Sequence, residues 1–279
     1  MFRKLIRNAG ALLSLIVLMT VVLAGLFAPL VSPHNPTDQQ AARRLMPPAW
    51  AEHGSQEYPL GTDQLGRDIL SRMIYGARIS LLVGVAAVLV SGVVGVALGL
   101  ISGYYGRWLD SLIMRLADIQ LGVPTLILAL AVVAVLGPGL RNVILVLGLT
   151  GWVTYGRLVR GEVLSIRQSE YVTSARALGS TDGHIIWRHV LPNIMPSIIV
   201  VATFEFARMI INEASLSFLG LGVTPPTPTW GGMIADGRTY IYNAWWVSTM
   251  PGIAIVLTVL AANVFGDWVR DVLDPQLRR

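Results

Sequence analysis

Long, nearly uncharged runs of residues are the feature that most constrains how this chain can fold. A helix that spans a membrane needs about 20 mostly apolar residues in a row. The 279-residue chain contains runs of roughly this length, and we expect six spans at residues 9–31, 79–103, 119–136, 142–159, 193–213 and 246–265. Because backbone groups inside a bilayer must be hydrogen-bonded internally, these runs predict an all-α, polytopic membrane protein.

The composition supports the same class of protein. The chain is 54% hydrophobic and only 13% charged, whereas soluble proteins carry about 25% charged residues. We therefore expect one transmembrane domain over residues 1–279 and no separate soluble domain. The dispersed arginines and the net charge of +5 fit contact with anionic lipid headgroups better than nucleic-acid binding.

The distribution of basic residues predicts the orientation of the spans. Arg3, Lys4 and Arg7 precede the first apolar run, which is longer than the core of a signal peptide and is expected to remain as an anchor. With this end in the cytoplasm, most arginines lie on the inner side, and residues 32–78 form a long extracytoplasmic loop. Both termini are then cytoplasmic, and an outer aromatic cluster is expected from Trp230, Tyr240, Tyr242, Trp245 and Trp246.

Two further segments carry local structural signals. The second span has small residues at four-residue spacing, which predicts close approach to another helix; these are Ala87, Ser91, Gly95, Gly99 and Gly103. Residues 222–232, with the sequence GVTPPTPTWGG, are rich in proline and glycine. We expect that segment to be a non-helical outer loop.

One polar segment interrupts the apolar profile late in the chain. Residues 170–192, EYVTSARALGSTDGHIIWRHVLP, are too polar to cross a bilayer. The pattern predicts a helix, a turn at Gly179, a second amphipathic helix and a stop at Pro192. A helical hairpin held between two spans at the cytoplasmic face indicates a docking element for another protein, so the energy source is expected on a different chain.

The sequence does not indicate enzymatic chemistry. The only lysine is Lys4, so no glycine-rich loop ending in lysine is present to hold nucleotide phosphates. Cysteine is absent, and there is no G-x-S-x-G motif. His184 and His189 are five residues apart, which places them off one face of an α-helix and gives no zinc-ligand spacing. We predict no catalytic residue and no metal site.

Charged residues inside a span are functional candidates because they are costly there. Glu205 lies near the middle of the fifth span, and Arg208 follows three residues later, which allows an ion pair on one helix face. The pair is either a structural ion pair or part of the lining of a substrate pathway, and the sequence leaves both possibilities open. Glu213 is expected to reach the outer rim.

The hairpin residues carry a resemblance to a known family. Thr173-Ser174-Ala175, Gly179 and Leu191-Pro192 resemble the EAA loop of ABC importer permeases, E-A-A-x3-G-x9-I-x-L-P. The spacing matches, but Thr173, Ser174 and His189 depart from the pattern. The runs 58–68, 75–81, 213–222 and 266–275 are similar to peptide-importer permeases of the DppC/OppC type.

This resemblance implies a type I importer fold and a set of partners. They are a homologous second permease of the DppB/OppB type, two cytoplasmic ATP-binding subunits that hold ATP and Mg, and an extracytoplasmic substrate-binding protein that meets the 32–78 loop. The hairpin would dock on an ATPase, and motion would pass through Pro192 into the fifth span. Arg176 and Arg188 would either pair with acidic groups of the ATPase, remain solvated or bind lipid. The location implied is a bacterial or archaeal inner membrane.

Alternatives differ in substrate or in class. Importers of nickel chelates and glutathione resemble the same family as importers of di- and oligopeptides. An ion-coupled carrier that acts alone would need no ATPase, and a receptor or scaffold would show no uptake.

Overall fold

The computed structural model describes Leu5 and residues 8–273. Arg3, Lys4, Arg7 and the tail after residue 273, on which part of the predicted orientation depends, lie outside this range. The described residues form helices without strands, apart from one isolated bridge between Thr62 and Asp68. The predicted all-α fold is confirmed by these elements: α2 (Ala9–Leu26), α3 (Ala28–Val31), η1 (Ala41–Arg43), α4 (Ile69–Tyr105), α5 (Arg107–Leu121), α6 (Thr125–Leu136), α7 (Leu140–Ile166), α8 (Glu170–Ala177), α9 (Asp182–Ile185), η2 (Ile186–Val190), α10 (Leu191–Phe218), α11 (Trp230–Gly237), η3 (Arg238–Tyr240) and α12 (Trp246–Leu273).

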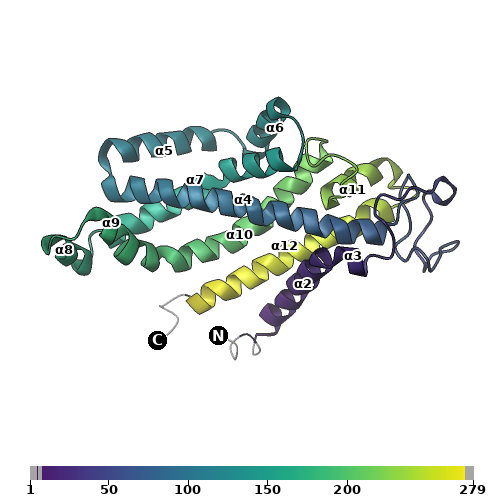
Figure 1. Cartoon of the computed structure of the whole chain (residues 1–279), viewed down its shortest axis with the longest axis horizontal. Coiled ribbons are helices and arrows are strands. Elements are labelled where there is room, and N and C mark those ends of the chain that lie inside the picture. The colour runs from purple at the N-terminus through teal and green to yellow at the C-terminus, as the bar shows by residue number, and fades with distance from the viewer. Residues whose placement is uncertain (1–4, 6–7, 274–279) are drawn as a thin grey trace.

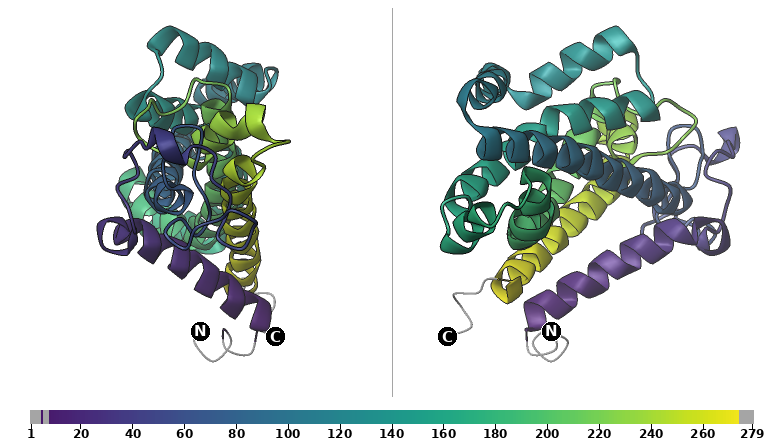
Figure 2. Two further views of the ribbon diagram at one scale, coloured as in Figure 1. Left: turned by 90° about the vertical axis from the view of Figure 1, so that its right-hand side faces the viewer. Right: turned by 60° about the vertical axis from the view of Figure 1, so that its left-hand side comes forward.

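The long helices α4, α7 and α10 run along the length of the molecule (Figure 1). The short helices α8 and α9 lie at one end, and α11 lies at the other end with the segment that precedes α4. The helices α2 and α12 contact each other and form one edge of the bundle (Figure 2). Within the described range, five helices are long and apolar enough to cross a membrane, or six if one bent pair is a single span.

That bent pair lies where the third span was predicted, over residues 119–136. These residues do not form one continuous helix, because α5 and α6 meet at an angle of 90°. Gly122 and Pro124 lie at the break. Proline disfavours helical geometry in the residue before it and has no N–H to donate, so the helix ends and restarts in a new direction.

The helix of the second predicted span begins earlier than the span. Residues 69–78 were assigned to the outer loop, and they form the first turns of α4. Asp68 caps this helix by accepting the Ser71 N–H at 2.9 Å. With 37 residues, α4 is about 55 Å long, which exceeds the bilayer core of about 30 Å and leaves room for polar turns outside the lipid.

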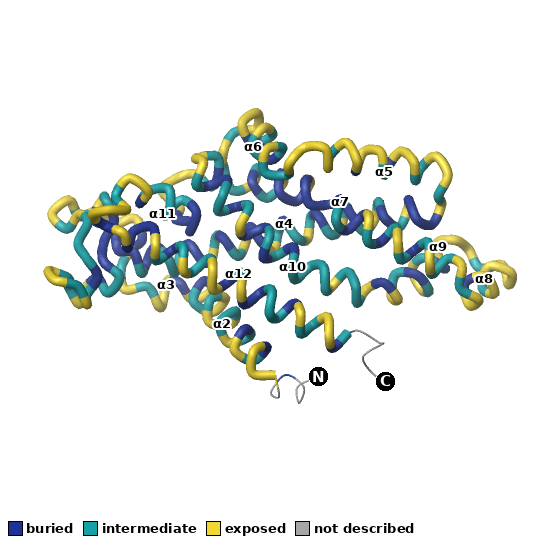
Figure 3. Tube along the Cα trace, turned by 180° about the vertical axis from the view of Figure 1, so that it is seen from behind, coloured by how far each residue is buried: buried dark blue, intermediate teal, exposed yellow. Residues whose placement is uncertain are grey.

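The glycine stripe allows close contact between α4 and α7. Residues 95, 99 and 103 of α4 face α7, and a Cβ added at Gly99 would lie 2.7 Å from both the Gly156 carbonyl oxygen and Val159 Cβ. The predicted close approach is therefore present. Buried residues, dark blue in Figure 3, concentrate along α4 and α7, whereas α5 and α8 are largely exposed.

The end of the molecule that carries α11 differs from two expectations. Residues 230–232 were predicted as loop but begin α11, because Thr229 caps that helix by accepting the Gly232 N–H at 3.1 Å. The predicted aromatic cluster at the surface is only partly present. Trp230 and Trp246 are buried, and their indole N–H groups donate to the carbonyl oxygens of Met73 and Thr62. Tyr242 and Trp245 are exposed.

Candidate functional site

The hairpin formed by α8 and α9, residues 170–185, is built around a glycine turn. Gly179 has a φ of +85°, a conformation that favours glycine because it has no Cβ. The Ser180 N–H donates to the Ala175 carbonyl at 3.1 Å, which closes the end of α8. Thr181 then caps α9. The predicted turn at Gly179 is present.

The predicted stop at Pro192 is wrong. The chain remains helical from Asp182 to Phe218, with a π-helical turn, η2, at Ile186–Val190. The Leu191 N–H donates to the Ile186 carbonyl, one residue further back than in an α-helix. This wider turn directly precedes Pro192. In a regular α-helix the proline ring would clash with the turn before it, and proline has no N–H to donate, so the wider turn accommodates it. Pro192 therefore lies at the start of α10 rather than at the end of a helix.

The same π turn changes the histidine geometry. On an α-helix, two residues that are five apart point in different directions. A π-helical turn has hydrogen bonds from i to i+5, so it brings such residues closer to the same face. The rings of His184 and His189 lie 5.8 Å apart, edge to face. The expectation that they fall off one face is wrong.

The other predicted coupling residues lie on both sides of the turn. Thr173, Ser174, Arg176 and Gly179 are exposed, and a Cβ added to Gly179 would meet no atom within 4 Å. Ala175 and Leu191 are half-buried, and Pro192 is exposed.

Three exposed apolar side chains on this segment were not predicted. Leu178, beside the turn, is 87% exposed, while Trp187 is 71% and Tyr171 is 46% exposed. Large apolar side chains exposed on an otherwise polar hairpin indicate contact with lipid or with a partner. The signal was present in the sequence, because Tyr171, Leu178 and Trp187 are large apolar side chains in a segment too polar to cross a bilayer.

The opposite face of the hairpin is buried against the bundle. Val172 of α8 and Ile185 of α9 belong to one apolar cluster with Val190 and Ile194, at the start of the long helix. Val159 and Val163 of α7 and Tyr104 of α4 complete it. The hairpin therefore packs directly on three helices of the bundle.

Arg176 contacts the bundle rather than only solvent. Its Nη2 donates to the Tyr104 hydroxyl at 3.1 Å, and this hydrogen bond raises the pKa of the guanidinium. No contact of Arg188 with an acidic group is present within the described residues.

The charged residues of α10 lie in two different environments. Arg208 Nη1 is 3.1 Å from Glu205 Oε1, with side-chain exposures of 42% and 5%, so the ion pair is present and its role stays a prediction. Glu213 was expected at the outer rim, and that placement is wrong because it is fully buried. Its carboxylate accepts hydrogen bonds from Ser80 Oγ of α4 at 3.1 Å and from Ser217 Oγ at 2.7 Å.

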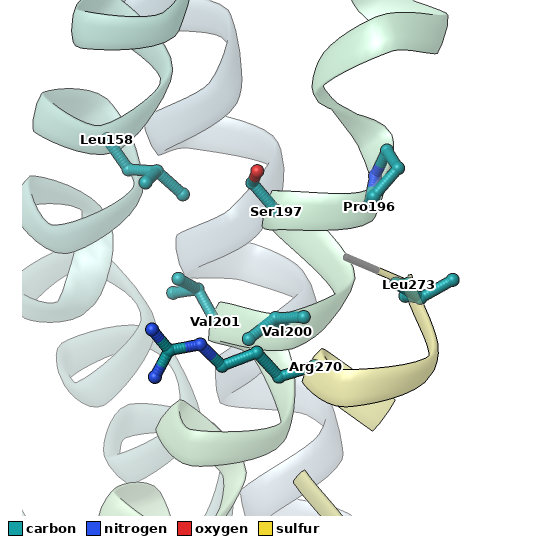
Figure 4. A pocket seen from close by; sticks show the side chains of 7 residues that line it. All are labelled: Leu158, Pro196, Ser197, Val200, Val201, Arg270 and Leu273. Atoms are coloured by element: carbon teal, nitrogen blue, oxygen red, sulfur yellow. The ribbon is translucent and has the colours of Figure 1, made fainter. Parts of the chain in front are cut away.

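A cavity of about 370 Å³ lies between α7, α10 and α12 (Figure 4). Ser197 and Val201 of α10 line it, with Leu158 of α7 opposite, and Arg270 is its one charged lining residue. Residues 197, 201, 205 and 208 fall on one face of a helix. The face that lines the cavity therefore continues to the ion pair of Glu205 and Arg208.

An ion network at the other end of the molecule was not predicted. Asp236 of α11 accepts hydrogen bonds from Arg67 at 3.1 Å and from Arg72 at 3.2 Å. Asp63 pairs with Arg67 at 2.6 Å and lies 3.5 Å from Arg72. The network joins α11 to the start of α4, although Asp236 is more than 160 residues from both arginines in sequence.

Comparisons with known proteins agree with this architecture. Residues 95–279 match the family model of the binding-protein-dependent transport system inner membrane component, and residues 1–48 match the N-terminal TM domain of oligopeptide transport permease C. The di/tripeptide transport system permease protein DppC of Pseudomonas aeruginosa is 46% identical over 97% of this chain and 89% of its own length. The dipeptide transport system permease protein DppC of Escherichia coli K12 is 45% identical over 98% and 91%.

A solved structure shares the fold. The chain matches an inward-facing conformation of the MetNI methionine ABC transporter with a TM-score of 0.61 and 19% identity, over 73% of this chain and 96% of that one. The multi-pass helical architecture, the family model over most of the chain and the relatives of high identity agree. The chain belongs to the family of inner membrane components of binding-protein-dependent transport systems.

Proposed function

We propose that this chain forms half of the translocation pathway of an ATP-driven importer for di- or oligopeptides. It pairs with a homologous permease, two cytoplasmic ATP-binding subunits supply the energy, and an extracytoplasmic binding protein delivers the peptide. The substrate class is supported by the relatives whose names specify dipeptide or di/tripeptide transport. Nothing in the described residues favours nickel chelates or glutathione over peptides.

The observation that carries the proposal is the shape of the α8–α9 hairpin. One face is buried against the bundle, while Leu178 at the turn is 87% exposed beside the polar residues 173 and 174. An anchored hairpin with an apolar tip fits a groove on a partner and can move with it. Since the basic residues favour a cytoplasmic location for this end, the partner is an ATP-binding subunit at the inner face of the membrane.

The pathway runs along the face of α10 that carries Ser197, Val201, Glu205 and Arg208. The cavity beside Ser197 and Val201 and the partial exposure of Arg208 support this course of the pathway. An intramembrane arginine that is 42% exposed in the isolated chain is expected to face a water-filled space or a partner helix rather than lipid. Glu213 is held by two serines and contributes to the packing of α4 on α10.

Single-cysteine cross-linking tests the docking of the hairpin. The chain has no cysteine, so Leu178→Cys places one thiol at the turn of the native complex. We expect a short bifunctional reagent to join it to an ATP-binding subunit, identified by mass. Thr227→Cys, exposed at the other end of the molecule, is the matched control and should give no such product. Absence of the Leu178 cross-link in native membranes would reject the docking site.

Transport in proteoliposomes separates the classes of function. The complete complex should take up a dipeptide only with ATP and the binding protein, and Gly179→Phe should reduce peptide-stimulated ATP hydrolysis because a side chain at positive φ strains the turn. Uptake by this chain alone on an ion gradient would instead identify a carrier. Deletion of the gene without any loss of uptake would favour a receptor or scaffold.

A further inference from the structure

One phenol holds both arms of the hairpin against the end of α4. The Tyr104 hydroxyl donates to Asp182 Oδ1 of α9 at 2.7 Å and accepts from Arg176 Nη2 of α8 at 3.1 Å. Its ring is buried, and the Arg176 guanidinium lies 5.6 Å from the ring centroid. Because Arg176 and Asp182 flank Gly179, the hydroxyl bridges the two sides of the turn.

The residue that carries this phenol is itself tightly held. Arg167, at the end of α7, donates from Nη1 to the Tyr104 carbonyl at 2.9 Å and to the Gly103 carbonyl at 3.3 Å. This contact places a positive charge at the carboxyl end of α4, where it is favourable. A Cβ at Gly103 would lie 2.8 Å from Val163 Cβ, so α4 and α7 have no room to slide at this level. Tyr104 thus projects from a stiff pair of helices.

Two routes therefore lead from the hairpin into the bundle. The covalent route runs from α9 through the π turn into α10, and the widened turn at Ile186–Val190 is a weaker link than a regular α-helix. The second route runs through the Tyr104 hydroxyl into α4 and α7. Its hydrogen bonds involve a carboxylate and a guanidinium, which makes them stronger than neutral ones.

We propose that Tyr104 is a positioning residue for energy coupling, which delivers displacement of the hairpin to α4 and α7 through Asp182 and Arg176. The inference rests on the proposed function, because it requires an ATP-binding subunit to move the hairpin. The movement would then reach the bundle through α4, which contains the second predicted span, as well as through α10, which contains the fifth.

Tyr104→Phe tests this role, because it keeps the buried ring and removes only the hydroxyl. The assay uses the complete complex in nanodiscs, with ATP hydrolysis measured with and without dipeptide-loaded binding protein. We expect basal hydrolysis within about twofold of wild type and a loss of at least about tenfold in stimulation, because one hydrogen bond to a charged group corresponds to about tenfold and the hydroxyl makes two. Tyr105→Phe is the control, since its ring is half exposed and its hydroxyl has no hydrogen bond within the described residues.

A second pair of changes distinguishes coupling from stability. Asp182→Ala should reproduce part of the loss, because the Arg176 hydrogen bond to Tyr104 remains. Asp182→Ala combined with Tyr104→Phe should be no worse than Tyr104→Phe alone, because removal of the hydroxyl already breaks both hydrogen bonds. Stimulation equal to wild type in Tyr104→Phe would overturn the proposal. So would a loss in which basal and stimulated hydrolysis fall in the same proportion, because that result reports only a smaller folded fraction.

Failure of the proposed function would look different. In that case the wild-type complex itself would show no stimulation by loaded binding protein, and the variants would match it. If loaded binding protein stimulates ATP hydrolysis equally in the wild type and in Tyr104→Phe, only the role of the hydroxyl is refuted.

Discussion

Asp236 is the carboxylate on which two buried arginines converge, and its removal has a calculable consequence. The side chains of Arg67 and Arg72 are 7% and 5% exposed, while Asp236 is 38% exposed. Asp236→Ala would leave both guanidiniums to share Asp63. Removing one partner of a buried ion pair costs about 3–5 kcal/mol, because an uncompensated charge remains. Since Asp63 stays and water reaches Asp236, we expect a loss of about 2–3 kcal/mol.

Thermal unfolding of the purified complex in detergent measures this loss. A destabilisation of this size should lower the unfolding midpoint by roughly 5–10 °C. Asp236→Asn keeps an oxygen acceptor and should fall between the wild type and Asp236→Ala. Asp38→Ala removes an exposed carboxylate without a side-chain partner within the described residues, and it should leave the midpoint unchanged.

A double variant tests the physical cause. Arg72→Met in the Asp236→Ala background removes one of the two uncompensated charges, so it should recover part of the lost stability rather than add to the damage. The reasoning fails if Asp236→Ala unfolds within about 1 °C of wild type, or if the two substitutions are simply additive.

Three further outcomes are expected. Gly99→Leu should separate α4 from α7 and abolish the monodisperse complex in size-exclusion chromatography, whereas Gly161→Leu, with nothing within 4 Å of an added Cβ, should not. Gln120→Leu removes hydrogen bonds of 2.6 and 2.8 Å to α7 and should lower stability by about 1–3 kcal/mol, seen as a lower midpoint. A hydrogen bond from Arg43 lowers the pKa of Glu57, so the carboxylate stays charged and the contact should still be present at pH 6. Loss of trypsin protection at Arg43 at pH 6, or an unchanged digestion pattern in Glu57→Gln, would contradict this.

Much of the fold follows from local chemistry. Apolar runs of span length must become helices, because a bilayer offers no partner for free backbone groups. The turn at Gly179 was predictable because it depends on one residue without a Cβ. The close approach of α4 to another helix was predictable from a four-residue spacing of small side chains, although the spacing did not identify α7 as the partner. The break between α5 and α6 also had a local signal in Gly122 and Pro124, but the strength of the apolar run over 119–136 concealed it.

The candidate site depended more on distant contacts. Leu178 and the other residues of the hairpin could be located from the sequence, but the partner of Arg176 could not. Tyr104 lies 72 residues from Arg176, and no pattern in either segment specifies the other. The alignment of His184 and His189 required the π turn, which forms where Pro192 meets a continuous helix.

The sequence by itself determined the class of protein, the regions of five long apolar helices and the location of the hairpin, because each depends on residues that are close in the chain. Only the tertiary structure decided which charged residues are buried. The burial of Arg72 is compensated by Asp236 from 164 residues away, and the burial of Glu213 is compensated by Ser80, which donates to it from 133 residues away. The cost of burying a charge depends on its partner, and the partner is known only when the chain is folded.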